Sequence, residues 1–214
     1  MNGSTIWPWA AVALLGAYHG VDPSMGWLFA VALGLQERSR ARVLWALAPI
    51  AAGHLISIAT VVAIVGGLRM ASFNADYIRY GGAAVLIAFG LFRLIWPRAH
   101  PRWVAMRVNA VELGLWSFLM ASAHGAGLML FPILMNVMPM HHSMHHHMPN
   151  VGTTFATGAL VTIVHTSAML IVMGTIAIVI YERVGLAILR SAWINLDVIW
   201  ASALIAAGAL SIFI

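Results

Sequence analysis

Residues 17–23 read Ala-Tyr-His-Gly-Val-Asp-Pro and lie inside an apolar run that extends from about residue 6 to residue 35. A carboxylate such as Asp22 costs about 2.5–3.5 kcal/mol at the centre of a membrane helix, so an ionisable residue there indicates a function. Gly20 and Pro23 weaken the helix at the same place. The run is also longer than the roughly 20 residues that cross a bilayer. The stretch therefore predicts a broken helix with His19 and Asp22 at the break, where they suit a cation.

The composition predicts an integral membrane protein. Of the 214 residues, 62% are hydrophobic and 8% are charged, whereas soluble domains carry about 25% charged residues. The basic residues are all Arg and fall in short connectors, which does not indicate a nucleic-acid-binding face. The absence of Cys excludes disulfides, thiolate sites and iron–sulfur clusters with four Cys ligands.

Hydropathy predicts six membrane-spanning helices, at residues 6–36, 43–68, 78–96, 109–138, 152–181 and 193–214. The first, third and fifth connectors together carry nine Arg with their flanks, and the second carries two. Basic connectors stay in the cytoplasm. We therefore expect a multi-pass protein of the cytoplasmic (inner) membrane, with both termini and the fourth connector on the non-cytoplasmic side.

Short motifs recur in the same order in the two halves of the chain. Ala17-Tyr18-His19-Gly20 in the first span corresponds to Ser122-Ala123-His124-Gly125 in the fourth, and His54 in the second corresponds to His165 in the fifth. With three spans per half, the halves would cross the membrane in opposite directions, as in transporters whose site lies near the midplane. The predicted fold is all-α, with six transmembrane helices in two inverted three-helix repeats, residues 1–108 and 109–214, and with helices 1 and 4 broken.

The four intramembrane histidines are predicted to lie at one depth. At 1.5 Å per residue, each lies roughly 20 Å along its span from the outer end. His19, His54, His124 and His165, together with Asp22, therefore predict a site for a divalent first-row transition metal, because imidazole suits these ions. The alternative for each histidine is a hydrogen bond to a neighbouring helix.

The fourth connector, residues 138–149, is rich in His and Met. Tracts rich in His are typical of metal binding, and thioethers favour Cu(I). On the non-cytoplasmic side such a loop would capture the ion. Its candidate ligands are His141, His142, His145, His146, His147, Met144 and Met148.

Residues 19–22 (His-Gly-Val-Asp), the basic turn 37–42 and residues 53–55 (Gly-His-Leu) resemble the start of nickel/cobalt permeases of the NicO type. They also resemble the urease/hydrogenase accessory proteins HupE and UreJ, within the wider LysE-like group of six-span transporters. Pro23 stands where that pattern usually has a second histidine. The resemblance implies a permease for nickel or cobalt, with His19, Asp22 and His54 on the ion path, and the Met content makes copper the other candidate metal.

Two other classes remain open. Four intramembrane histidines could hold haem b between His pairs, although two stacked haems need His at two depths. The chain could also be a metal-binding accessory subunit of a larger membrane complex, or act as a homo-oligomer. Residues 141–147 resemble one His box of a membrane di-iron oxygenase, but such enzymes need several boxes on one face, so we expect no enzyme. The expected partners are a transition-metal ion and the lipid bilayer, and no nucleic acid.

Overall fold

The computed structural model describes residues 3–70, 74–95, 108–137, 151–183 and 196–213. Every element within these ranges is helical, so the predicted all-α class is confirmed for them. In chain order the elements are α1 (Gly3–Val21), the short 3-10 helix η1 (Pro23–Met25), α2 (Trp27–Glu37), α3 (Arg40–Met70), α4 (Ala75–Ile95), α5 (Ala110–Ala123), α6 (Ala126–Met129), α7 (Phe131–Val137), α8 (Val151–Arg183) and α9 (Leu196–Phe213).

Three of the described helices are long and apolar enough to cross a membrane, over Arg40–Leu68, Asp76–Ile95 and Phe155–Arg183. Large apolar side chains lie on the outside of the bundle: Val111 is 80% exposed and Ile171 is 69% exposed. Polar side chains such as His54 are buried inside it. This distribution fits a lipid environment, where intramembrane ionisable residues face the bundle interior. The six spans, the repeat and the orientation stay predictions.

The first apolar segment breaks directly after His19-Gly20-Val21. α1 ends at Val21, and Asp22 is extended, with its side chain accepting the Ser24 N–H as the cap of η1. Pro23 takes the first position of η1, where a helix needs no N–H donor. Gly26, with φ +123°, then lets the chain restart as α2, because only glycine adopts this conformation readily.

The fourth apolar segment breaks at the corresponding place. α5 ends at Ala123, His124 follows as its C-cap, and Gly125 turns the chain with φ +67° before α6 begins. A second interruption at Leu130 separates α6 from α7. Both apolar segments that carry a His-Gly pair are therefore split into shorter helices.

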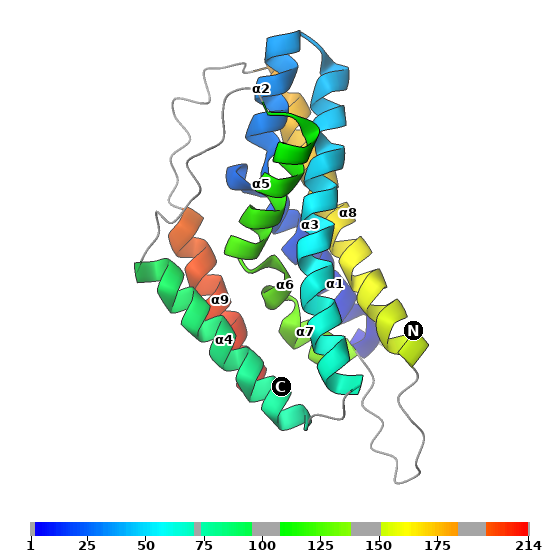
Figure 1. The fold of residues 1–214 in the computed structure, drawn as a ribbon, viewed down its shortest axis with the longest axis vertical. Coiled ribbons are helices and arrows are strands. Elements are labelled where there is room, and N and C mark those ends of the chain that lie inside the picture. The colour runs from blue at the N-terminus through cyan, green and yellow to red at the C-terminus, as the bar shows by residue number, and fades with distance from the viewer. Residues whose placement is uncertain (1–2, 71–73, 96–107, 138–150, 184–195, 214) are drawn as a thin grey trace.

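The helices associate in three close pairs, α1 with α8, α3 with α5, and α4 with α9. Figure 1 shows α4 and α9 side by side at the edge of the bundle. Glycines permit the other two pairs: Gly16 of α1 lies against the His165 backbone, and Gly53 of α3 lies against the Gly114 carbonyl of α5. At each position a Cβ would overlap backbone atoms of the partner helix.

His54 lies between two apolar cores. Ile50 belongs to a core with Met25 and Leu113, and Ile58 belongs to another with Leu130. Residues four apart share a face of a helix, so Ile50, His54 and Ile58 follow one another along the buried side of α3. The imidazole of His54 therefore lies between two apolar layers of the core.

Candidate cation site

Three imidazole rings meet in the interior, each from a different helix. His19 of α1, His54 of α3 and His165 of α8 are all fully buried. The ring centroids are 4.9 Å apart for His19 and His165, 5.6 Å for His19 and His54, and 5.5 Å for His54 and His165. We refer to these three side chains as the three-histidine cluster.

His19 makes a hydrogen bond that fixes its tautomer, whereas the ring nitrogens of His54 and His165 make none with described residues. His19 Nδ1 lies 2.9 Å from the Leu15 carbonyl oxygen, and because a carbonyl only accepts, Nδ1 is the donor and Nε2 carries the lone pair of the neutral ring. Both ring nitrogens of His54 are buried without a hydrogen-bond partner in the described ranges. The Val12 carbonyl lies beside His165, yet neither nitrogen of this ring meets the geometry of a hydrogen bond with a described residue.

The spacing of the rings matches that of imidazoles around one ion. With metal–nitrogen bonds of about 2 Å, imidazoles held tetrahedrally by one ion have ring centroids roughly 5 Å apart. The donor atoms themselves do not converge: among the described residues, no group of three or more His, Asp or Glu side chains could hold a metal ion as placed. The ring centroids are thus close enough for one ion, although the side chains as placed do not form a metal-binding group.

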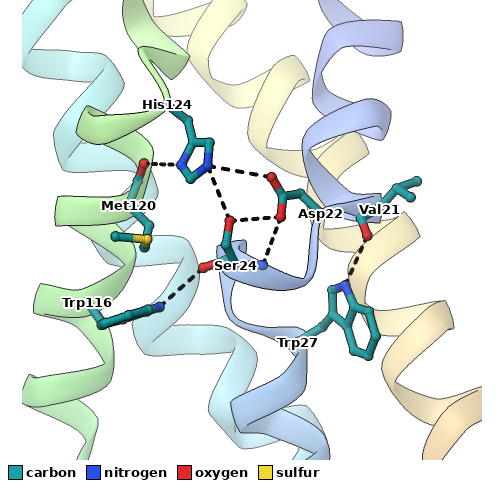
Figure 2. A network of polar contacts seen from close by, with 7 residues as sticks. All are labelled: Val21, Asp22, Ser24, Trp27, Trp116, Met120 and His124. Atoms are coloured by element: carbon teal, nitrogen blue, oxygen red, sulfur yellow. Dashed lines mark hydrogen bonds and ion pairs between the residues drawn. The ribbon is translucent and has the colours of Figure 1, made fainter. Parts of the chain in front are cut away.

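Asp22 and His124 form a second buried group beside η1. Figure 2 shows the Asp22 carboxylate and the His124 ring facing each other across Ser24, with Asp22 Oδ2 3.7 Å from His124 Nε2. The Ser24 N–H and O–H both donate to Asp22 Oδ1, each at 2.8 Å. His124 Nδ1 donates to the Met120 carbonyl at 2.8 Å, the same i−4 bond that His19 makes.

The structure divides the predicted site residues between these two groups. His19, His54 and His165 form the cluster, and Asp22 and His124 form the second group. His19 and Asp22 do not lie on one helix, because α1 ends at Val21 and Asp22 caps the next helix. The predicted loop ligands, His141, His142, His145, His146, His147, Met144 and Met148, lie outside the described residues.

Two residues that bond to the second group, Ser24 and Trp116, were not among the sequence candidates. Ser24 links Asp22 to His124, and the run Asp22-Pro23-Ser24 contains a signal for it, since an Asp before Pro is a common helix cap whose oxygen binds nearby N–H groups. Trp116 donates its indole N–H to the Ser24 carbonyl at 3.2 Å. No local pattern identifies Trp116, because the bond joins residues 92 positions apart.

A cavity of about 530 Å³ opens among α2, α3 and α5. Its polar lining includes Gln36, Glu37 and Glu112. Trp116 lies one helical turn beyond Glu112 along α5 and packs edge-to-face on Phe29, with ring centroids 5.3 Å apart. Along α5, the Trp116 ring therefore lies between this cavity and His124.

No family model, curated protein or solved structure matches the chain.

Proposed function

We propose that the chain is a permease for a divalent transition-metal cation, with nickel or cobalt as the first candidates and copper as the other. The proposal includes six membrane spans in two inverted repeats, residues 1–108 and 109–214. The helix pairing supports the repeat, since the first helical segment of each half packs on the second of the other (α1 on α8, α5 on α3) and the third segments, α4 and α9, pack together. In both His19 and His124, Nδ1 bonds the carbonyl of the residue four positions earlier, which supports the repeat as well.

The observation that carries the proposal is the three-histidine cluster. A buried polar atom left without a hydrogen bond costs about 1–3 kcal/mol, and both nitrogens of His54 are in this state in the described structure. A protein that needed only packing would place a leucine there. A ligand that accepts the lone pairs of several imidazoles explains the arrangement, and a first-row transition-metal cation is such a ligand.

The residues suggest how transport proceeds. Neutral imidazoles replace part of the hydration shell of the ion, and protons compete with the ion for the same nitrogens. The Nδ1–H bond of His19 to Leu15 fixes its Nε2 toward the ion, as hydrogen bonds to the non-ligating nitrogen do in metal sites. Movement of the two halves against each other would expose the cluster to either side in turn.

The haem b alternative fits the cluster poorly. A haem needs two imidazoles on opposite faces of its iron with the porphyrin between them. Each ring of the cluster has both others within 5.6 Å, so a porphyrin between any two would displace the third. We expect the visible spectrum of the purified protein to lack a Soret band, and a Soret band would contradict this reasoning.

Uptake of Ni²⁺ or Co²⁺ into liposomes that contain only this protein tests the proposal. We expect uptake with the native chain, loss of uptake with His54→Ala, and retention with the matched variant Ile56→Ala, whose side chain is 58% exposed on the same helix. Full uptake by His54→Ala would refute the role of the cluster. Absence of uptake by the native chain, with metal still bound, would favour the accessory-subunit class.

A further inference from the structure

The second group, Asp22 with Ser24 and His124, brings together atoms that all present lone pairs. His124 uses Nδ1–H on Met120, so Nε2 of the neutral ring is an acceptor. The only hydroxyl proton of Ser24 is donated to Asp22 Oδ1, so the side of Oγ that lies 3.4 Å from His124 Nε2 is an acceptor too. Asp22 Oδ2 is buried and has no hydrogen bond among the described residues.

Three acceptors this close together repel one another unless a positive charge lies among them. Helix ends add to the negative potential: α1 ends at Val21 and α5 ends at Ala123, and the C-terminus of a helix carries roughly half a negative charge. In the described structure, His124 is the only basic side chain within ion-pair distance of Asp22. Two independent features therefore favour a cation here: the clustered acceptor atoms and the two helix C-termini.

We propose that Asp22 Oδ2, Ser24 Oγ and His124 Nε2 form a second cation site, distinct from the three-histidine cluster, which takes the same divalent transition-metal ion. This inference rests on the proposed function and deepens it. The second site offers a carboxylate, a hydroxyl and one imidazole, whereas the cluster offers imidazole alone. A carboxylate and a hydroxyl are harder ligands than imidazole, so the two sites bind the ion differently.

The arrangement makes the two sites neighbours on one path. His19 belongs to the cluster and precedes Asp22 by three residues, and His124 is close enough to His19 to interact with it electrostatically. Several sites of moderate affinity allow an ion to enter and leave, whereas one tight site retains it. The ion is thus handed between the cluster and the Asp22 site during transport.

The number of Co²⁺ ions bound per full-length chain, measured by elemental analysis after equilibrium dialysis, tests this inference. Asp22→Asn keeps the cap of η1, because Asn caps helices as well as Asp does. We expect Asp22→Asn and His54→Ala each to lose one Co²⁺ relative to the native chain, and the double variant to lose two. Ions held elsewhere in the chain cancel in these differences. The matched control is Asp76→Asn, which removes an exposed carboxylate paired with Arg79 and should lose none.

The absorption spectrum of bound Co²⁺ separates the two sites further. Asp22→Asn should keep the bands of an ion with nitrogen ligands, and His54→Ala should keep those of an ion with mixed oxygen and nitrogen ligands. If the single and double variants all lose the same one ion, the six residues form one site; this outcome overturns the inference while transport in liposomes still stands. If Asp22→Asn loses no ion, Asp22 and His124 are an ion pair only, and the inference is wrong.

Discussion

His54 and His165 hold their rings parallel to within 1°, with centroids 5.5 Å apart, although the rings come from α3 and α8. A ligating imidazole points a nitrogen lone pair at the ion within the plane of its ring. Parallel rings that lie in different planes cannot both do so. Binding therefore requires at least one ring to turn about its side-chain torsions, of which χ2 is soft in His.

The metal-free protein should become more stable when His54 is replaced by leucine. His54→Leu removes two buried nitrogens that have no hydrogen bond among the described residues and keeps a side chain of similar size. We expect a gain of about 1–2 kcal/mol in the free energy of unfolding, because an unsatisfied buried polar group costs about that much. Thermal unfolding in detergent with a chelator measures it.

The matched control for this change is Ser57→Ala, one turn along α3. Ser57 is hydrogen-bonded to Ser122 at 2.9 Å, so its loss should lower stability by about 1 kcal/mol. Added Ni²⁺ should stabilise the native chain more than His54→Leu, which keeps only the Asp22 site, because each occupied site contributes about 2.7 kcal/mol at a hundred times its dissociation constant. A lower melting temperature for metal-free His54→Leu would contradict the view that the buried nitrogens of His54 cost stability.

Two glycines of α3 should respond in opposite ways to alanine. At Gly53 a Cβ would overlap the Gly114 carbonyl and approach Phe118 N to 2.8 Å, so the α3–α5 pair must separate. Gly53→Ala should destabilise by about 1–3 kcal/mol or more, as overpacking does. At Gly67 a Cβ meets no described atom within 4 Å, so Gly67→Ala should stabilise by up to about 1 kcal/mol through helix propensity.

Unfolding of the two variants in the same detergent gives the comparison. Ni²⁺ uptake adds a second measurement, because Gly53 adjoins His54 and Gly67 does not. Equal stability of the two variants would show that the close α3–α5 approach does not limit packing.

Features that depend on residues close together in the chain follow from the sequence, whereas features that join distant residues do not. The breaks after His19 and His124 follow from local chemistry, since each precedes a glycine, and the helical rise alone brings the histidines to a similar depth. The pairing of Asp22 with His124 does not follow from local rules. It requires the exact turn at Asp22-Pro23-Ser24 and the approach of α5, which Gly53 and Gly114 permit.

Trp116 should act as a seal between the 530 Å³ cavity and the second site. The chain contains no Cys, so a single introduced thiol reports its own accessibility. Met120→Cys replaces a side chain that is 1% exposed, one turn beyond Trp116 on α5. We expect it to resist a water-soluble maleimide in the otherwise native chain and to react once Trp116→Ala is added. Trp116→Phe keeps a ring on Phe29 and should preserve the protection.

The control for the seal is Leu115→Ala, which removes an exposed side chain from the neighbouring position of α5. It should leave Met120→Cys protected. If Met120→Cys is labelled at the same rate with Trp116 intact as with Trp116→Ala, the Trp116 ring does not separate the cavity from the second site.

Removal of residues 138–148 should affect capture and leave translocation unchanged. In the proposed permease, the predicted loop ligands would raise the local ion concentration, whereas the three-histidine cluster would carry the ion across. We expect the variant to show a higher KM for Ni²⁺ or Co²⁺ uptake in right-side-out vesicles, with an unchanged maximal rate. A replacement of the five His of this segment by Ser, at constant length, is the control for loop shortening. A lower maximal rate with unchanged KM would place the segment in the transport step.

The orientation predicted from the basic connectors is testable by the same thiol chemistry. Arg40 pairs with Glu182 at 3.2 Å, which places the first connector and the C-terminal end of α8 at one end of the bundle. The positive-inside rule predicts that this end faces the cytoplasm. In intact cells, Ser143→Cys should therefore react with a membrane-impermeant maleimide, and Ser39→Cys should react only after the membrane is opened. The reverse labelling pattern would invert the topology, and the His/Met segment would then face the cytoplasm and release ions there instead of collecting them.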